Sequence, residues 1–243
     1  MGYIWNRIGA IQANLGISID SQGNVFVADY VNHRIQKFGS DSTYIRQWGQ
    51  LGSGDGEFRF PMDVAVDTNG NVFVTDTGND RTQKFSNTGE FIRSWGASGT
   101  DNGQFMSPVY IDVDSQGNVF VAGTVNHRIQ KFTNTGTFLT KTIADITYPR
   151  GMSTDFTGNV YLSDETEIKE FSTDLHFLSK WGHVGNGPGQ WFMPVGLDVV
   201  TPGFVSFKKY VYVTDPGSAR VQIYFWEPDI HPRCYTFREI CSC

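Results

Sequence analysis

The feature that most constrains the fold is a ten-residue phrase that recurs at nearly constant spacing. Its clearest copy, Asp67–Asp76, reads DTNGNVFVTD, and close copies end at Asp29 and Gly123, so that 47 residues separate each ending from the next. Two looser copies end at Asp164 and Asp215, after steps of 41 and 51 residues. A chain with such a period folds as a series of similar units, each of which buries its apolar faces against its neighbours.

One repeat, from Pro61 to Trp95, predicts four short antiparallel strands. Runs rich in Val, Phe and Ile alternate with Gly, Asn, Asp, Ser and Thr, which is typical of strands joined by tight turns. The second run is apolar on both faces, so both faces of the sheet must be covered. Gly70 falls where the first hairpin needs a positive φ. The predicted strands are Asp63–Val66, Val72–Thr75, Thr82–Phe85 and Phe91–Trp95.

Four strands per repeat and this period predict an all-β fold, a β-propeller of four-stranded antiparallel blades. Five repeats are recognisable, which fit either a five-bladed ring or an incomplete six-bladed ring. We place the propeller at residues 1–226 and an irregular tail at residues 227–243, because Pro228 and Pro232 disfavour a strand there. The N-terminal run Tyr3–Ile8 resembles the fourth strand of a blade, and it either closes the ring or is the remnant of an upstream blade.

Turn phrases within the repeats carry a resemblance to a known family. Asn32-His33-Arg34-Ile35 and Asn126-His127-Arg128-Ile129 each follow the repeated phrase and precede Gln-Lys-Phe. Over roughly residues 16–226 the chain resembles the NHL-repeat family, which is named for an Asn-His-Leu phrase at this place. The resemblance implies a β-propeller, commonly with six blades. It implies no single activity, because members include protein-interaction, RNA-binding and enzymatic propellers.

The charge of the chain bears on its partners. A net charge of −6 and a pI of about 5.3 argue against nucleic-acid binding, which needs a concentrated positive field. Lys37, Lys84 and Lys131 recur once per repeat, so they are spread over successive blades and form no single basic patch. No apolar run approaches the length of a membrane span. We therefore expect a protein, peptide or glycan partner, no membrane span, and a monomer or a part of a larger chain.

The linkers between repeats share one design. Each long linker is rich in Gly and carries a Gly-x-aromatic phrase, whose aromatic residue (Phe58, Phe105 or Trp191) we expect to anchor it. Up-and-down strand order places the linkers and the turns between second and third strands on one rim. His33 and His127 lie in these turns, where metal binding or base catalysis is one interpretation; because the residue recurs with the repeat, we favour a role in the turn. The arginines after the turns are expected to pair with a strand-end Asp of a neighbouring blade: Arg34, Arg81, Arg128 and Arg220.

Candidate ligand-binding residues are those that break the repeat on this rim. One variable slot follows the end of the second strand, and further variable residues flank the entry to the first strands. Together they could line a shallow pocket over the central channel, where propellers usually bind ligands, although drift in solvated loops explains the variation equally well. The candidates are Tyr30, Thr77, Thr124 and Glu165 in the slot, and Arg59, Tyr148 and Arg150 beside it.

Metal-binding candidates are weaker. Asp112 and Asp198 align with each other on predicted innermost strands, where carboxylates near the axis could hold Ca²⁺. We favour the alternative that they bond to inner-strand amides, so no cofactor is expected beyond, at most, Ca²⁺. One histidine and three cysteines of the tail lack the paired spacing of ordinary structural zinc sites. These are His231, Cys234, Cys241 and Cys243.

These observations favour a non-enzymatic scaffold that binds a protein, peptide or glycan at the linker-side rim. The alternative is an enzyme resembling the lyases or lactonases built on related propellers, with a site at the channel mouth and with or without Ca²⁺. Such enzymes need His and carboxylate side chains that converge at non-repeated positions, whereas His176, His183 and His231 are dispersed. We therefore lean toward a binding function and assign no catalytic residue.

Overall fold

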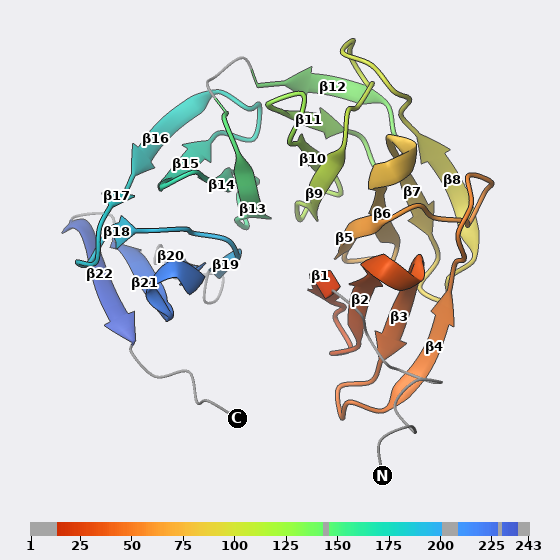
Figure 1. Ribbon diagram of the computed structural model, residues 1–243, viewed down its shortest axis with the longest axis horizontal. Coiled ribbons are helices and arrows are strands. Elements are labelled where there is room, and N and C mark those ends of the chain that lie inside the picture. Colours follow the sequence, from red (N-terminus) through yellow and green to blue (C-terminus); the bar gives the residue numbers. More distant parts are fainter. Residues whose placement is uncertain (1–13, 143–145, 201–208, 228–229, 238–243) are drawn as a thin grey trace. The chain divides into compact units, whose positions relative to one another are not determined.

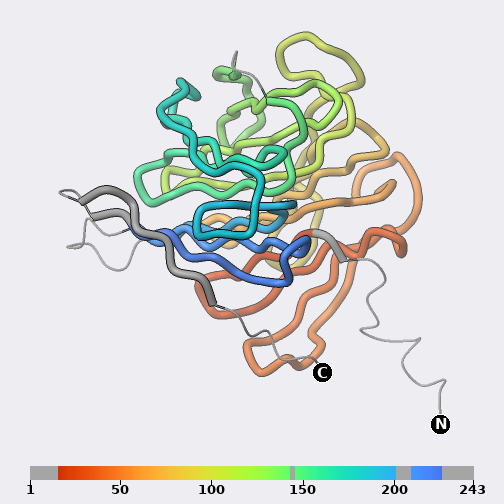
Figure 2. The backbone as a smooth tube through the Cα atoms, turned by 60° about the vertical axis from the view of Figure 1, so that its left-hand side comes forward, coloured from red at the N-terminus to blue at the C-terminus, as the bar shows by residue number. Residues whose placement is uncertain are grey.

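The computed structural model describes residues 14–142, 146–200, 209–227 and 230–237, and it divides into two compact units. The first unit holds the residues up to Asn126 together with Gln130–Leu139, and the second holds His127–Ile129 together with the residues from Thr140 onward. In Figures 1 and 2 the first unit runs from red to green along the chain and the second from green to blue.

The first unit is built on three four-stranded antiparallel sheets, in which each strand pairs with the strand before it in the chain (Figure 1). Short 3₁₀ turns, η1 (Tyr30–Asn32) and η2 (Thr77–Asn79), join the second and third strands of the first two sheets. The strands are β1 (Asn14–Ile19), β2 (Val25–Asp29), β3 (Arg34–Phe38) and β4 (Tyr44–Trp48); β5 (Pro61–Val66), β6 (Val72–Asp76), β7 (Arg81–Phe85) and β8 (Phe91–Trp95); and β9 (Pro108–Val113), β10 (Val119–Gly123), β11 (Arg128–Phe132) and β12 (Phe138–Lys141).

The second unit is built on two further sheets of the same topology and one short strand pair in the linker between them. The 3₁₀ turn η3 (Pro216–Ser218) lies between the second and third strands of the last sheet. The strands are β13 (Pro149–Thr154), β14 (Val160–Asp164), β15 (Glu167–Phe171) and β16 (Phe177–Trp181); β17 (His183–Val184) and β18 (Gln190–Trp191); and β19 (Leu197–Val200), β20 (Lys209–Asp215), β21 (Arg220–Glu227) and β22 (Ile230–Phe237).

The described ranges therefore contain five four-stranded antiparallel blades of an all-β propeller, which confirms the predicted fold class. The four strands predicted between Pro61 and Trp95 agree with β5–β8 to within two residues at each end. Gly70 has a φ of 80°, as its turn requires. No helix in these ranges has the length and apolar character needed to cross a membrane.

Apolar side chains of the strands pack successive blades of a unit together. Between the first and second blades, Phe26 and Ile35 lie against Val64, Val74 and Phe85, and all five are buried. Every residue of β6 is buried, which is why its sequence is apolar on both faces. The second unit has an equivalent core between its two blades, which includes Tyr161, Ile168, Val199, Val211, Val213 and Tyr224.

The C-terminal end of the fifth blade differs from the prediction. We expected irregular structure after Trp226, but β22 (Ile230–Phe237) pairs with β21 and completes the sheet. Pro232 is tolerated because β22 is the outermost strand of its sheet and the pairing register shifts beside this proline. Part of the predicted tail, residues 227–243, thus belongs to a blade. The run Tyr3–Ile8 lies outside the described residues.

Candidate binding site on the linker-side rim

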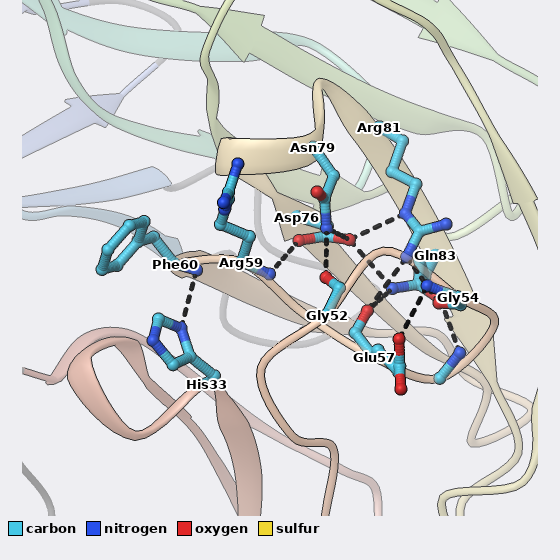
Figure 3. A network of polar contacts seen from close by, with 11 residues as sticks. His33, Gly52, Gly54, Glu57, Arg59, Phe60, Asp76, Asn79, Arg81 and Gln83 are labelled. Atoms are coloured by element: carbon cyan, nitrogen blue, oxygen red, sulfur yellow. Dashed lines mark hydrogen bonds and ion pairs between the residues drawn. The ribbon is translucent and has the colours of Figure 1, made fainter.

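One buried carboxylate, that of Asp76 at the end of β6, holds the second blade's turn to the linker before it (Figure 3). Its Oδ2 accepts hydrogen bonds from Asn79 Nδ2 (2.9 Å), Arg81 Nε (2.7 Å) and Gln83 Nε2 (3.0 Å). Its Oδ1 accepts a hydrogen bond from the backbone N–H of Arg59 (2.7 Å). Four donors on one buried carboxylate fix the relative positions of strand, turn and linker.

The donors on Asp76 also hold the linker backbone in place. Asn79 Nδ2 donates to the carbonyl of Gly52 (2.9 Å), and an Arg81 terminal nitrogen donates to that of Gly54 (2.7 Å). The aromatic anchors predicted for the linkers are buried to 1% exposure or less, which confirms their assignment. They are Phe58, Phe105 and Trp191.

Three of the four arginines after the turns, Arg34, Arg81 and Arg220, pair with the strand-end Asp of their own blade, which corrects the prediction that they reach an Asp of a neighbouring blade. Arg34 Nε lies 2.7 Å from Asp29 Oδ2, and an Arg220 terminal nitrogen lies 3.5 Å from Asp215 Oδ2. The physical reason is the strand register, because each Asp stands directly opposite its Arg at the end of the hairpin.

The described linkers all end in the same way. Each of them leads to the proline that opens the next blade. Two residues before this proline, a backbone N–H group donates a hydrogen bond to a side chain of that blade. The accepting side chain lies at the end of the second strand or in the turn after it. The donors and acceptors are Arg59 and Asp76 (2.7 Å), Thr147 and Asp164 (2.9 Å), and Phe192 and Asp215 (3.3 Å). Gly123 replaces the aspartate in the third blade, and there Met106 donates to Asn126 Oδ1 (2.5 Å) instead. These four linkers thus share one backbone hydrogen bond at this position, whereas their side chains differ.

Arg59 is held by its backbone and exposes its side chain. Its carbonyl accepts a hydrogen bond from the N–H of Gly78 in η2 (2.8 Å), and a Cβ atom on Gly78 would lie 2.5 Å from Arg59 Cγ. The stem of the arginine therefore rests on a residue that has no side chain. The guanidinium points away from the Asp76 network (Figure 3), and no hydrogen bond or ion pair reaches it from the described residues.

Phe60, the next residue, presents an exposed ring in a fixed position. Its φ of 54° is unusual for a bulky side chain, and 39% of its surface is exposed. The rings of Tyr30 and His33 flank it, with centroids 5.0 Å and 4.7 Å away. His33 Nδ1 accepts a hydrogen bond from the Phe60 N–H (3.1 Å), which holds the backbone in this conformation.

The histidines of the turns occupy a position with special backbone geometry. The residue at this position is left-handed in each turn, with φ between 48° and 53°. At two of these positions the side chain accepts a hydrogen bond from the end of the next linker, through His33 Nδ1 (3.1 Å) and Asp80 Oδ1 (2.8 Å). This is the role in the turn that we favoured over catalysis. The residues are His33, Asp80, His127, Glu165 and Ala219.

The predicted ligand-binding residues of the first unit fall into two places. Tyr30, Arg59 and Thr77 lie around the junction of the first two blades, where Tyr30 contacts Phe60 and Thr77 precedes the glycine under Arg59. Thr124 occupies the corresponding turn of the third blade. The sequence prediction does not include Phe60, because it rests on the variable position after the second strand and on a few residues beside the first strands. The place of Phe60 in the linker, where another residue type stands in each blade, was the available signal.

The remaining candidates lie in the second unit. Tyr148 is 56% exposed, and its ring lies 6.3 Å from that of His127. Glu165 donates its backbone N–H to the carbonyl of Tyr148 (3.4 Å), so these two residues adjoin. Arg150 lies on β13, and its Nε is buried without a hydrogen-bond partner. A ligand-binding role for all these residues remains a prediction.

Asp63 on β5 is a functional candidate that the sequence analysis did not identify. In the first, fourth and fifth blades the same position holds glycine: Gly16, Gly151 and Gly196. This break in the repeat was the signal that could have found it. Asp63 Oδ2 accepts a hydrogen bond from the N–H of Ile111 (3.0 Å), and Oδ1 accepts one from the N–H of Val64 (2.9 Å).

The surroundings of Asp63 change its acidity. A Cβ atom on Gly16 would lie 2.1 Å from Asp63 Oδ1, so the carboxyl fills space that the glycine of β1 leaves open. Burial raises the pKa of Asp63, the amide hydrogen bonds from Ile111 and Val64 lower it, and the charge of Asp112 raises it, so that the pKa lies at about 7. A carboxyl of this kind titrates near neutral pH.

The two weak metal candidates have ordinary hydrogen-bond partners. Asp112 Oδ1 accepts a hydrogen bond from the N–H of Val113 (2.8 Å), and Asp198 Oδ1 accepts one from Ser153 Oγ (3.5 Å). Within the described ranges, no three or more His, Cys, Asp or Glu side chains are grouped so that they could hold a metal ion. The side chains of the tail residues considered for zinc lie outside the described part.

Comparison with known proteins places the fold in context. The chain resembles the crystal structures of virginiamycin B lyase from Staphylococcus aureus (13% identity, 93% of this chain and 70% of that chain, TM-score 0.67) and of the gluconolactonase XC5397 from Xanthomonas campestris (14%, 92% and 75%, TM-score 0.64). It also resembles a chain of a nidogen–laminin complex (16%, 88% and 76%, TM-score 0.67). At these identities the likeness concerns the fold alone. A search of curated protein sequences finds no match.

The family signal lies in the first two blades. The family model for the NHL repeat matches residues 15–38 and 58–85, which span the turn phrase of the first blade and its counterpart in the second. Both matches end in the Gln-Lys-Phe phrase of a third strand. The chain therefore carries two matched NHL repeats within a fold of four-stranded β-propeller blades.

Proposed function

We propose that this chain is a non-enzymatic propeller that binds a protein partner through the linker-side ends of its blades. The observation that carries the proposal is an accumulation of exposed apolar side chains at these ends in both units. In the first unit they are Val31, Leu51, Phe60, Met106 and Val125, and in the second Tyr148, Val184, Phe192 and Met193. Single exposed apolar residues are normal on protein surfaces, but a recurring set at one end of every blade marks an interaction surface.

The opposite ends of the blades differ in composition. Their turns consist mostly of Asp, Ser, Thr, Asn and Gly, and among the described residues Phe156 is the one exposed large apolar side chain within them. These turns are internally bonded; for example, Asp67 Oδ1 accepts hydrogen bonds from the N–H groups of Asn69 (2.9 Å) and Asn71 (2.8 Å). The contrast supports a partner on the linker side.

The rigidity of the linker-side ends also supports binding. Each described linker is fixed by an aromatic anchor or by a backbone hydrogen bond to a strand end, so the backbone that carries the exposed side chains is already ordered before a partner binds. Association then loses little conformational entropy, which favours affinity.

An enzymatic function is the second candidate, and Asp63 is the observation that favours it. A carboxyl with a pKa of about 7 beside a second carboxyl, Asp112, is the type of group that acts as a general acid or base. The likeness to a lyase and a gluconolactonase gives this candidate a fold precedent. The test is a lactone-hydrolysis assay with the wild type and Asp63→Asn. Turnover that the substitution abolishes would favour the enzyme.

The binding proposal is tested with a variant that carries charge on the rim of both units. Phe60→Glu and Phe192→Glu are combined, and Phe156→Glu on the opposite ends is the matched control. Proteins that bind the immobilised wild-type chain should also bind the control variant, and they should not bind the rim variant. Unchanged capture by the rim variant would contradict the proposal. Selective binding of the chain to an immobilised glycan array would show that the partner is a glycan and not a protein.

A further inference from the structure

We infer that Arg59 and Phe60 form the main contact of the linker-side rim, and that they recognise a peptide segment in which an Asp or Glu side chain adjoins an apolar side chain. The inference rests on the proposed function and names the chemistry of its partner. It is carried by two adjacent residues of one fixed linker, an arginine with an available guanidinium and a phenylalanine with an exposed ring.

Arg59 differs from the neighbouring arginines in having no internal acceptor among the described residues. Arg34 binds Asp29 and the side chain of Gln47, and Arg81 binds Asp76 and linker carbonyl groups. A guanidinium has five N–H donors in a planar fork that matches a carboxylate. An incoming carboxylate can therefore form two parallel hydrogen bonds with Arg59 without breaking an existing one.

Phe60 has the properties of a residue that dominates an interface. Large aromatic side chains near the centre of a contact often contribute most of the binding free energy. The ring of Phe60 is exposed yet held between Tyr30 and His33, so it loses little freedom when it is covered. Its left-handed backbone is a strained conformation for a bulky residue, and strain of this kind concentrates at functional sites.

The directions of the two side chains define the ligand. In Figure 3 the side chains of Arg59 and Phe60 leave the linker in different directions. A small anion would reach only the guanidinium, and a small apolar molecule would reach only the ring. A ligand that contacts both must present two neighbouring side chains, as an extended peptide does.

Charge argues for a carboxylate rather than a nucleic-acid backbone. Binding a phosphate backbone requires several exposed cations along a track. The recurring lysines do not supply them, because Lys37 and Lys84 are buried with their ammonium groups over the rings of Phe26 (5.0 Å) and Phe73 (5.2 Å). The free guanidinium of Arg59 matches one carboxylate, and the net charge of −6 disfavours a polyanion such as a nucleic acid.

The test is a peptide-display selection on the immobilised full chain, followed by fluorescence polarisation with the best peptide. The peptide and an analogue with Asn or Gln in place of its acid are titrated against wild type, Arg59→Gln, Phe60→Ser, Phe192→Ser and the control Phe156→Ser. Phe156 lies at the opposite ends of the blades and is the control, whereas Phe192, which occupies in the last linker the position of Arg59, tests the contribution of a second place on the rim. We expect affinity to fall about tenfold or more for Arg59→Gln and for Phe60→Ser, and less than about twofold for the control.

The acid analogue gives the second readout. It should bind the wild type as weakly as the parent peptide binds Arg59→Gln, and the two changes together should cost no more than either alone. Circular dichroism melting curves check that both variants fold. Peptides that retain affinity for Arg59→Gln and Phe60→Ser but lose it for Phe192→Ser would overturn this inference and leave the proposed function standing. A selection that enriches no peptide would overturn this inference, whereas unchanged protein capture by the rim variant would overturn the proposed function.

Discussion

Replacing Asp63 by Asn should stabilise the chain at alkaline pH and have little effect in acid. The folded protein raises the pKa of this carboxyl from 3.8 to about 7, chiefly because burial disfavours its charge. A raised pKa means that the folded state holds the proton more tightly than the unfolded state does. The resulting stabilisation is complete below pH 3.8 and is lost as the pH rises through about 7.

The magnitude follows from the two pKa values. Their difference corresponds to about 4 kcal/mol at 1.36 kcal/mol per pKa unit. This is an upper bound, because Asp63 retains some contact with solvent. Between about pH 4.5 and about pH 8 the wild type should lose about 3 kcal/mol through this group alone. Asn carries no charge at any pH, and its carbonyl oxygen can still accept one of the amide hydrogen bonds from Ile111 or Val64.

The measurement is urea unfolding of both proteins at several pH values across this range. The difference between wild type and Asp63→Asn cancels every other titrating group, so it isolates the carboxyl. Asp112→Asn is the control for the neighbouring charge: it should lower the pKa of Asp63 and move the loss of stability to lower pH. A difference between wild type and Asp63→Asn that stays constant from about pH 4.5 to about pH 8 would refute the reasoning.

Three further predictions concern single contacts. Gly70→Val should cost about 1–2 kcal/mol, because φ is 80° there, and an unchanged urea midpoint would contradict the turn assignment. Ile111 and Ile17 occupy equivalent strand positions but are 3% and 63% exposed, so Ile111→Ala should lower the free energy of unfolding by about 2–5 kcal/mol and Ile17→Ala by less than about 1 kcal/mol. Equal losses in urea unfolding would mean that another surface covers Ile17 in solution. Lys209→Met removes the partner of Asp155 (2.5 Å) and should cost on the order of 3 kcal/mol at neutral pH. Burial raises the pKa of Asp155, but hydrogen bonds and charge interactions, chiefly with Lys209, hold this pKa below 3.8. The cost of Lys209→Met should therefore shrink in acid, as Asp155 becomes protonated, and a cost that does not change with pH would exclude the ion pair.

The blades could be predicted from the sequence because their determinants are local and repeated. The second strand NVFVTD, the glycine of the first hairpin and the buried aromatic of each long linker all follow from residue type and spacing. Each of these signals occurs several times, so an error in one copy is corrected by the others. The structure confirms the strands, Gly70 and Phe58 for this reason.

The errors concern features that depend on position in the sheet. Pro232 argues against a strand in general, but β22 is the outermost strand of its sheet and has a register shift beside the proline, two settings in which a strand tolerates proline. The Asp–Arg pairs were assigned to neighbouring blades because pairing was considered without strand register, which places Asp29 opposite Arg34. Asp63 is absent from the predicted sites because the prediction compares Asp112 with Asp198, which align with each other. The signal for Asp63 is that other blades hold a glycine at its position.

The repeated and the variable residues of this chain have different physical tasks. The acceptor at the end of the second strand fixes the backbone of the linker, and this holds even where Gly123 replaces Asp, because Asn126 supplies the oxygen. In the four described linkers the first of the two residues before the proline is therefore held through its backbone N–H, whereas the side chains of both residues differ: Arg59 and Phe60, Met106 and Ser107, Thr147 and Tyr148, Phe192 and Met193. Because the backbone N–H makes the bond, exchanging these side chains leaves the blade intact. Binding specificity can thus change at the rim without changing the stability of the scaffold that presents it.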